Sequence, residues 1–499
     1  MKTLKAGDLA IFLDETQLRY IQCNGVEIVR GIYAAVRNEN WDTIIPKVEV
    51  VSLKEGEAAF KIVLNALYQQ DDIQFKASLT YKGKSNNEIE CIFEGKAYSN
   101  FKKNRIGFCV LHPLRECVGK EIIINGREKQ TFPVFISPHQ PFFNVQSMTW
   151  FPTENSQAEL FFEGEIFETE DQRNWTDASY KTYCTPLSKP FPVWVKEGEE
   201  IKQKVVLKFQ VFDNKVFVGE KEAPHLPQFP TELEEVHTCL GLGISTEKAN
   251  LSEQEMAWLK SSKVDHLRAD IELFNPNWQA EMKRASEQAN ALRWKLEAVL
   301  HFSENYKQEA NDFLNHTISK SVSYHSILLL RYRKAGWETT AQQFLVNAFR
   351  KILPEVKLGI GTDAYFAELN RASFDISNID FIGFSINPQV HAFDDLSLIE
   401  TLEAQKDTIL TAKQKYGNIP VHVHSVTLKP RFNPNATNPN ETGYPQSDER
   451  QSSDFCYQWT KASIGILHKA GAESLTYFET VGRRGVMDGK KFPVFEAFC

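Results

Sequence analysis

Two glutamates carry the strongest chemical signal in the sequence. Glu368 lies in the segment TDAYFAELNR and Glu479 in YFETVGRRG, and each follows a short apolar run that is typical of a buried strand. A pair of carboxylates can act as general acid and base, or as acid and nucleophile, depending on their separation. We therefore expect Glu368 and Glu479 to be catalytic. The alternative interpretation is structural, with Glu368 paired to Arg371 and Glu479 paired to Arg483 or Arg484.

Further polar residues follow the other apolar runs of the C-terminal half. Their donors and acceptors suit the hydroxyls and carbonyl of a sugar-like molecule, and some could stabilise a developing oxyanion. The residues expected to bind substrate are Arg268, Asp270, His301, Asp363, Asn370, Asn387, Gln389, His391 and His424. The candidates for the oxyanion are His424, Asn387 and Arg268.

The histidines raise the question of a metal site. His422 and His424 alternate onto one face of a strand, and His301 and His391 end other strands. The HxH pair lies on the seventh apolar run of this half rather than the first, and no lysine or bridging acid accompanies it. We therefore expect no metal and no cofactor. In this interpretation His422 faces the surrounding helices and His424 hydrogen-bonds the substrate.

These residues need a scaffold that brings strand ends together, and the C-terminal half predicts one. It contains eight strand-like runs, which alternate mostly with amphipathic stretches such as SEQEMAWLKSSK. The runs are TCLGLGI, VDHLRADI, KLEAVLHF, VSYHSILLL, EVKLGIG, IDFIGFSI, IPVHVHSV and ESLTYFE. The pattern favours a (β/α)8 barrel with its chemistry at the carboxyl ends of the strands. An open doubly wound sheet is less favoured because no glycine-rich phosphate fingerprint follows the first run.

The N-terminal half has a different rhythm. Segments such as DLAIFLD, IQFKASLTYK and EIECIFEGKAY alternate with period two and are separated by Gly, Asn, Asp and Lys turns, which predicts a β-sandwich. Three prolines in KEAPHLPQFPTELEE mark a linker. We expect a sandwich domain at 1–225 and a barrel domain at 226–499. The sequence stops at PVFEAFC, where a closing helix would begin, which leaves open whether the barrel domain is truncated at its C-terminal end.

Composition narrows the class of partner. The chain of 499 residues has a formal charge of -8, from 57 Lys and Arg against 65 Asp and Glu, and its basic residues are scattered. Nucleic acid is therefore not an expected partner. We find no signal-peptide core and no apolar run of membrane-spanning length, so we expect a soluble, cytoplasmic protein that binds no membrane. The eight cysteines lack CxxC pairs and predict reduced thiols. The oligomeric state stays open.

One long mixed motif gives a resemblance to a known family. The stretch EDQRNWTDASYKTYCTPLSKPFP resembles the D-apionate lactonases, and so do GTDAYFAELNR, SINPQVHAFDD and YFETVGRRG. The resemblance implies an N-terminal β-sandwich, a glycosidase-like barrel and hydrolysis of D-apionolactone to D-apionate during breakdown of apiose. Two alternatives remain, a retaining glycoside hydrolase acting on apiosyl or related glycosides, and a carbohydrate-binding protein without catalytic activity.

The charged part of that motif, from Glu170 to Tyr183, has two interpretations. In the first it is an interdomain clasp, in which Arg173 and Lys181 bridge acids while Trp175 packs beneath them. In the second it is a loop that supplies substrate-binding groups. In the first interpretation the polar groups are paired with one another, whereas in the second they serve the substrate.

Overall fold

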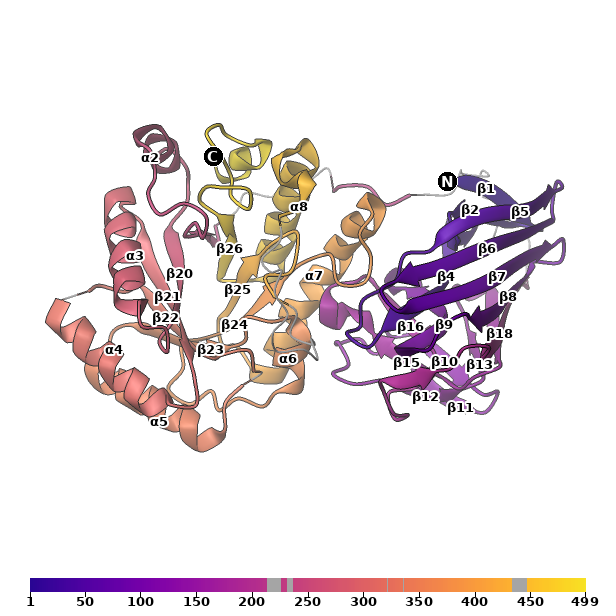
Figure 1. Ribbon diagram of the computed structural model, residues 1–499, viewed down its shortest axis with the longest axis horizontal. Helices are drawn as coiled ribbons and strands as arrows, with labels where there is room; N and C mark the ends of the chain where they lie inside the picture. The colour runs from indigo at the N-terminus through magenta and orange to yellow at the C-terminus, as the bar shows by residue number, and fades with distance from the viewer. Residues whose placement is uncertain (213–225, 231–236, 321, 335, 433–446) are drawn as a thin grey trace. The chain divides into compact units, whose positions relative to one another are not determined.

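The computed structural model describes residues 1–212, 226–230, 237–320, 322–334, 336–432 and 447–499. The chain forms two compact units, coloured in sequence order in Figure 1. Among the described residues, the first unit contains 1–172, 178–212 and 226–227, and the second contains 173–177, 228–230 and the residues from 237 onward. The proline-rich segment 221–235, which we interpreted as a linker, lies mostly outside the described residues.

The first unit is built from two antiparallel sheets, each of nine strands within the described residues. One sheet has the strand order β1 (Lys2–Ala6), β2 (Leu9–Asp14), β3 (Gln17–Cys23), β4 (Val26–Asn38), β9 (Phe101–Pro113), β16 (Ser179–Tyr183), β15 (Phe167–Asp171) and β12 (Phe142–Val145), and β17 (Val193–Val195) pairs with β9. The order in the other is β11 (Glu128–Thr131), β10 (Glu121–Ile124), β13 (Ser147–Trp150), β14 (Ser156–Glu163), β18 (Glu200–Val211), β8 (Glu88–Ala97), β7 (Ile73–Lys84), β6 (Phe60–Gln70) and β5 (Lys47–Glu55).

Alternation along the strands explains how these sheets pack. In β7 every second side chain, from Ile73 onward, is buried, and the residues between them are exposed or half-buried. The buried faces of the two sheets meet through aromatic rings. The ring centroids of Phe75 (β7) and Phe101 (β9) lie 6.3 Å apart, and those of Phe93 (β8) and Phe108 (β9) lie 6.0 Å apart. The predicted β-sandwich is confirmed.

The second unit is a closed barrel of eight parallel strands. Around the ring they are β19 (Cys239–Gly243), β20 (His266–Glu272), β21 (Lys295–Phe302), β22 (Ser326–Arg331), β23 (Lys357–Gly361), β24 (Phe381–Ile386), β25 (Val421–Val426) and β26 (Ser474–Glu479). Each lies within one of the eight predicted runs or overlaps it, so the predicted barrel is confirmed. Figure 1 shows helices ranged around the outside of this ring.

The helices of the chain lie mainly between the barrel strands. They are α1 (Leu114–Cys117), α2 (Glu253–Lys260), α3 (Trp278–Leu292), α4 (Tyr306–Lys320), α5 (Thr339–Ile352), α6 (Phe366–Arg371), α7 (Asp395–Tyr416) and α8 (Asp454–Ala470), with 3-10 turns η1 (Gln172–Trp175), η2 (Glu449–Ser452) and η3 (Pro493–Phe498). A capping box starts α2, since Ser252 Oγ accepts from Glu255 N and Glu255 Oε2 accepts from Ser252 N. Within the ranges described above, no helix combines the length and the hydropathy that a membrane crossing needs.

Three glycines on barrel strands leave room for rings on the strand that follows each of them. A Cβ atom on each glycine would collide with the ring. The pairs and the resulting distances to the nearest ring atom are Gly241 and His266 (2.0 Å), Gly359 and Phe381 (2.2 Å), and Gly383 and His424 (2.3 Å). Glycine is therefore a steric requirement at these positions, because large side chains fill the barrel interior.

Candidate active site

A charged group at the carboxyl ends of the barrel strands forms what we call the mouth cluster, made of Arg268, Asp270, His301, Asp363 and Arg431. Asp270 is its centre. Its carboxylate accepts hydrogen bonds from Arg268 Nη2 at 2.8 Å, Arg431 Nη2 at 2.8 Å and His301 Nε2 at 3.0 Å. His301 Nδ1 lies 3.8 Å from Asp363 Oδ2. Four of the residues predicted to bind substrate are thus brought together.

Electrostatics ties this cluster to one of the predicted catalytic residues. Burial opposes ionisation of Asp270, but Arg268 and Arg431 hold its pKa well below the usual range. Burial likewise opposes the charge of Arg431, yet Asp270, Asp363 and Glu479 together raise its pKa. Glu479 therefore lies within electrostatic reach of Arg431. A permanently charged guanidinium placed among three carboxylates is a candidate donor to a developing oxyanion.

A small pocket opens beside the mouth cluster. Its lining includes Asp363, Tyr365, Asn387, Thr427 and Arg431. The loops after β23, β24 and β25 supply these residues, so the pocket lies where barrel enzymes carry their chemistry. The pocket accounts for two of the predicted substrate-binding residues, Asp363 and Asn387.

Glu479 ends β26, and the surrounding residues fix its carboxylate. Thr246 donates to it from its backbone N at 2.9 Å and from Oγ1 at 2.8 Å, and Arg484 Nε donates at 2.9 Å. The contact with Arg484 is the ion pair that the structural alternative anticipated. The Glu479 side chain nevertheless remains 13% exposed. A carboxylate held this firmly is oriented in advance for any role it has at the mouth.

Glu368 lies in the first turn of α6, the helix that follows β23. Its Oε2 atom is fully buried and has no hydrogen-bond partner among the described residues. Burial raises its pKa to about 7, nearby Asp363 adds to the rise, and Arg371 opposes it. At neutral pH this carboxyl group therefore keeps its proton for much of the time, which is the state that a general acid needs.

Asn370 and His391 lie beside the middle of the charged motif. Residues 173–177 belong to the same compact unit as the barrel. Asn370 Nδ2 donates to Asn174 Oδ1 at 3.0 Å, and His391 Nδ1 lies 2.6 Å from Asp177 Oδ2. Trp175 packs edge-on against the His391 ring, with centroids 5.4 Å apart. These contacts occupy both predicted residues with protein partners.

The basic residues of the motif are paired with acids. Arg173 Nη1 donates to Asp407 Oδ2 at 2.8 Å within the second unit. Lys181 Nζ lies 2.5 Å from Glu170 Oε1 within the first unit. Trp175 contacts His391 and the guanidinium of Arg371, which lies 5.2 Å from its ring.

Gln389 is held in place by hydrogen bonds from both ends of its amide. Its Nε2 donates to Leu428 O and to Asp448 Oδ2, both at 2.7 Å, and its Oε1 accepts from Arg450 Nη2 at 3.1 Å. The side chain therefore connects the loops after β24 and β25. This arrangement gives Gln389 a positioning role in the structure.

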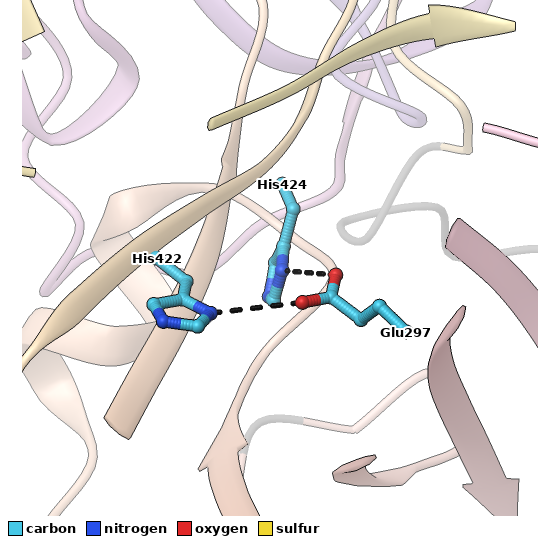
Figure 2. Close-up of side chains that lie close together, drawn as sticks. All are labelled: Glu297, His422 and His424. Carbon is cyan, nitrogen blue, oxygen red and sulfur yellow. Dashed lines mark hydrogen bonds and ion pairs between the residues drawn. The ribbon is translucent and has the colours of Figure 1, made fainter. Parts of the chain in front are cut away.

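The two histidines of the HxH pair lie deeper, with Glu297 of β21, in what we call the inner cluster (Figure 2). His424 Nδ1 lies 3.2 Å from Glu297 Oε1, and His422 Nδ1 lies 3.6 Å from Oε2. The interpretation that His422 faces the helices is wrong. Its ring stacks on Phe381 inside the barrel at 3.9 Å, because strand alternation puts both histidines on the same inner face.

Two residues of these clusters were not identified from the sequence. Glu297 had a signal, a single acid inside the apolar run KLEAVLHF, because an unpaired carboxylate is costly to bury. Arg431 had no comparable signal, since it lies in a loop whose course depends on tertiary structure. Both occupy positions that only the closed barrel brings together.

The fold and site define a class, a two-domain barrel enzyme with its polar groups at the strand ends. Two family models match the chain, the D-apionate lactonase N-terminal domain over residues 1–211 and the D-apionate lactonase TIM barrel domain over residues 240–498. The chain therefore belongs to the D-apionate lactonase family and is a lactone-hydrolysing enzyme.

A curated relative and several solved structures resemble this chain. A D-apionate lactonase of Brucella anthropi is 27% identical, and the match covers 98% of this chain and 84% of that protein. A GH30 endoxylanase of Clostridium papyrosolvens is 11% identical with a TM-score of 0.35, covering 54% of this chain and 72% of its own. The spore cortex-lytic enzyme SleL of Bacillus cereus is 10% identical with a TM-score of 0.36, covering 66% and 82%. Likenesses this distant carry no argument about chemistry.

Proposed function

We propose that this protein hydrolyses D-apionolactone to D-apionate at the barrel mouth, as a step in the breakdown of apiose. The family membership and the name of the Brucella anthropi relative support the substrate. The single observation that supports the site is the pocket at the strand ends, in which Arg431 lies with Asp363 and Asn387 and donates to Asp270 at 2.8 Å. Lactone hydrolysis develops negative charge on the carbonyl oxygen, and a fixed guanidinium beside that oxygen would stabilise it.

Glu479 is the proposed base. Thr246 and Arg484 hold its carboxylate in one orientation, which suits a group that must take a proton from a positioned water. The oxygen of that water then bonds to the lactone carbonyl carbon. The carbonyl electron pair moves to its oxygen, next to Arg431, and a tetrahedral intermediate results.

Glu368 is the proposed acid. Collapse of the intermediate breaks the bond between the former carbonyl carbon and the ring oxygen, and that oxygen leaves as an alkoxide that needs a proton. A carboxyl group with a pKa of about 7 holds a transferable proton at neutral pH. The product is an open-chain hydroxy acid. The proton taken by Glu479 returns to solvent and Glu368 regains one from solvent, so both carboxyl groups return to their starting states. The remaining mouth residues, Asp363, Asn387 and His301 among them, would hold the hydroxyls of the substrate.

The reaction releases an acid, so a pH-stat titration measures it directly. Wild-type protein should consume base in proportion to added D-apionolactone and should leave aryl glycosides intact. Release of the aryl group, without turnover of the lactone, would identify a retaining glycoside hydrolase instead. Binding of sugar lactones without any turnover would identify a carbohydrate-binding protein and would also contradict the proposal.

A further inference from the structure

The inner cluster has the composition of a metal site. Glu297, His422 and His424 are 1%, 3% and 1% exposed, and one potential ligand atom from each lies within 4.8 Å of the others. One carboxylate and two imidazoles are ligands of the kind that Zn²⁺ binds. We propose that these three residues bind one zinc-class divalent ion inside the barrel. None of these three residues belongs to the mouth cluster, and the proposal does not depend on the proposed function.

The spacing between the carboxylate and each histidine is close to that of ligands around a tetrahedral ion. With metal-to-ligand bonds of about 2.0–2.2 Å, two ligands of a tetrahedral zinc lie roughly 3.3–3.6 Å apart. The carboxylate oxygens of Glu297 lie 3.2 Å from His424 Nδ1 and 3.6 Å from His422 Nδ1. Figure 2 shows both rings presenting a nitrogen to the same carboxylate. Because the three ligand atoms lie within 4.8 Å of one another, they must move closer together for one ion to bind all three.

The charge and the hydrogen bonding of Glu297 also favour a bound cation. Within the part of the chain that the structure describes, the ion-pair partners of Glu297 are the two histidines. Ser326 Oγ adds a hydrogen bond to Oε2 at 3.0 Å. The Nδ1 atom of His422 is buried and has no hydrogen-bond partner among the described residues. A bound cation would neutralise the buried carboxylate and, by displacing the ring proton, would ligate Nδ1.

The surroundings of His422 resemble an outer coordination shell. Its Nε2 atom lies 3.9 Å from Glu473 Oε1, on the side of the ring opposite to Glu297. Ligating histidines commonly direct the second ring nitrogen at a carboxylate, which fixes the ring and raises its basicity. Phe381 covers one face of the same ring. Glu473 and Phe381 thus lie against two sides of the His422 ring, while Nδ1 faces the proposed ion.

Metal analysis of intact protein gives the first test. Wild-type protein, purified without chelator from zinc-supplemented cells, should contain one zinc per chain by inductively coupled plasma mass spectrometry. Glu297→Gln and His424→Asn should each lose most of that zinc. His316→Asn changes a histidine on α4, away from the cluster, and should keep it. A wild-type protein with only trace metal would overturn the proposal.

Two further measurements keep the proposal testable if a variant fails to fold. A wild-type crystal should give an anomalous peak at the zinc edge bonded to all three residues, with bonds of about 2.0–2.2 Å. Zinc found only on the surface, or an ordered ring-to-carboxylate hydrogen bond in place of an ion, would contradict it. Removal of zinc during gentle unfolding and refolding should lower the Tm of the wild type, and added Zn²⁺ should restore it. A Tm that does not respond to Zn²⁺ would also count against the site.

Discussion

The mouth cluster and the inner cluster each place one acidic side chain among basic groups, but the basic groups differ. At the mouth, Asp270 is bonded to two arginines and a histidine, and its side chain is 26% exposed. In the inner cluster, Glu297 is almost completely enclosed and faces only histidines among its described ionic partners. Arginine is always charged, whereas histidine can be neutral and can ligate a metal. The first arrangement suits polarisation of a substrate and the second suits coordination of an ion.

The largest expected effect is a loss of protein stability when Asp270 in the mouth cluster loses its charge. Asp270→Asn leaves the guanidinium of Arg268, which is 1% exposed, without its main counter-charge. We expect the free energy of unfolding to fall by about 3 kcal/mol, measured by urea denaturation. Asp312→Asn, an exposed change on α4, is the matched control and should stay within about 0.5 kcal/mol of wild type. An equally small effect for Asp270→Asn would show that Arg268 does not depend on it.

The proposed catalysis at the mouth is tested by substitution of Glu368 and Glu479. Glu368→Gln and Glu479→Gln keep the shape of each side chain, so both variants should fold. Each should lower kcat for D-apionolactone by at least about a hundredfold, since that is the usual loss when a general acid or base is removed. The control is Glu287→Gln on α3. Near-normal kcat in either variant, with an unchanged Tm, would make that residue structural.

A smaller effect is expected in the pH dependence, and it arises from Glu368. Its pKa rises from 4.5 to about 7 in the folded protein, so the folded state binds the proton more tightly than the unfolded state does between these values. Stability should therefore fall as pH rises through that range, and kcat should fall above pH 7 as the acid ionises. Glu368→Gln should lack this part of the stability profile. Identical pH profiles of stability for wild type and variant would remove the basis for its role as acid.

The smallest expected effect is that of a chelator on turnover. Because the proposed ion lies in the inner cluster and the proposed chemistry at the mouth, dialysis against EDTA should leave kcat unchanged, as measured in the pH-stat. Loss of activity that only Zn²⁺ or Mn²⁺ restores would join the two clusters into one functional site, and they would no longer have separate roles.

The barrel was predictable because each strand can be recognised from its own short stretch of sequence. Its eight strands are short apolar runs between amphipathic helices, and this pattern predicted the barrel. Because barrel enzymes carry their chemistry at the carboxyl ends of the strands, the site was expected there. The sandwich followed from simple alternation, as in β7. These signals depend only on neighbouring residues, so they survive without knowledge of the rest of the chain.

The partners of the site residues were less predictable, because they come from distant segments. The bonds of Gln389 reach Asp448 and Arg450, which follow another strand, and His391 meets Asp177, more than two hundred residues earlier. The error over His422 has a different cause. Alternation had already put both histidines on one face, and only the closed ring shows that this face is the interior.

The pairs of glycines and rings inside the barrel have a consequence for sequence change. A larger residue at Gly383 can be accepted only if residue 424 loses its ring, and the same coupling joins positions 241 and 266, and 359 and 381. Each pair shares one volume that two side chains cannot both fill. Relatives that keep this barrel should therefore exchange the members of a pair together, so that compensated double changes appear where single ones are rejected.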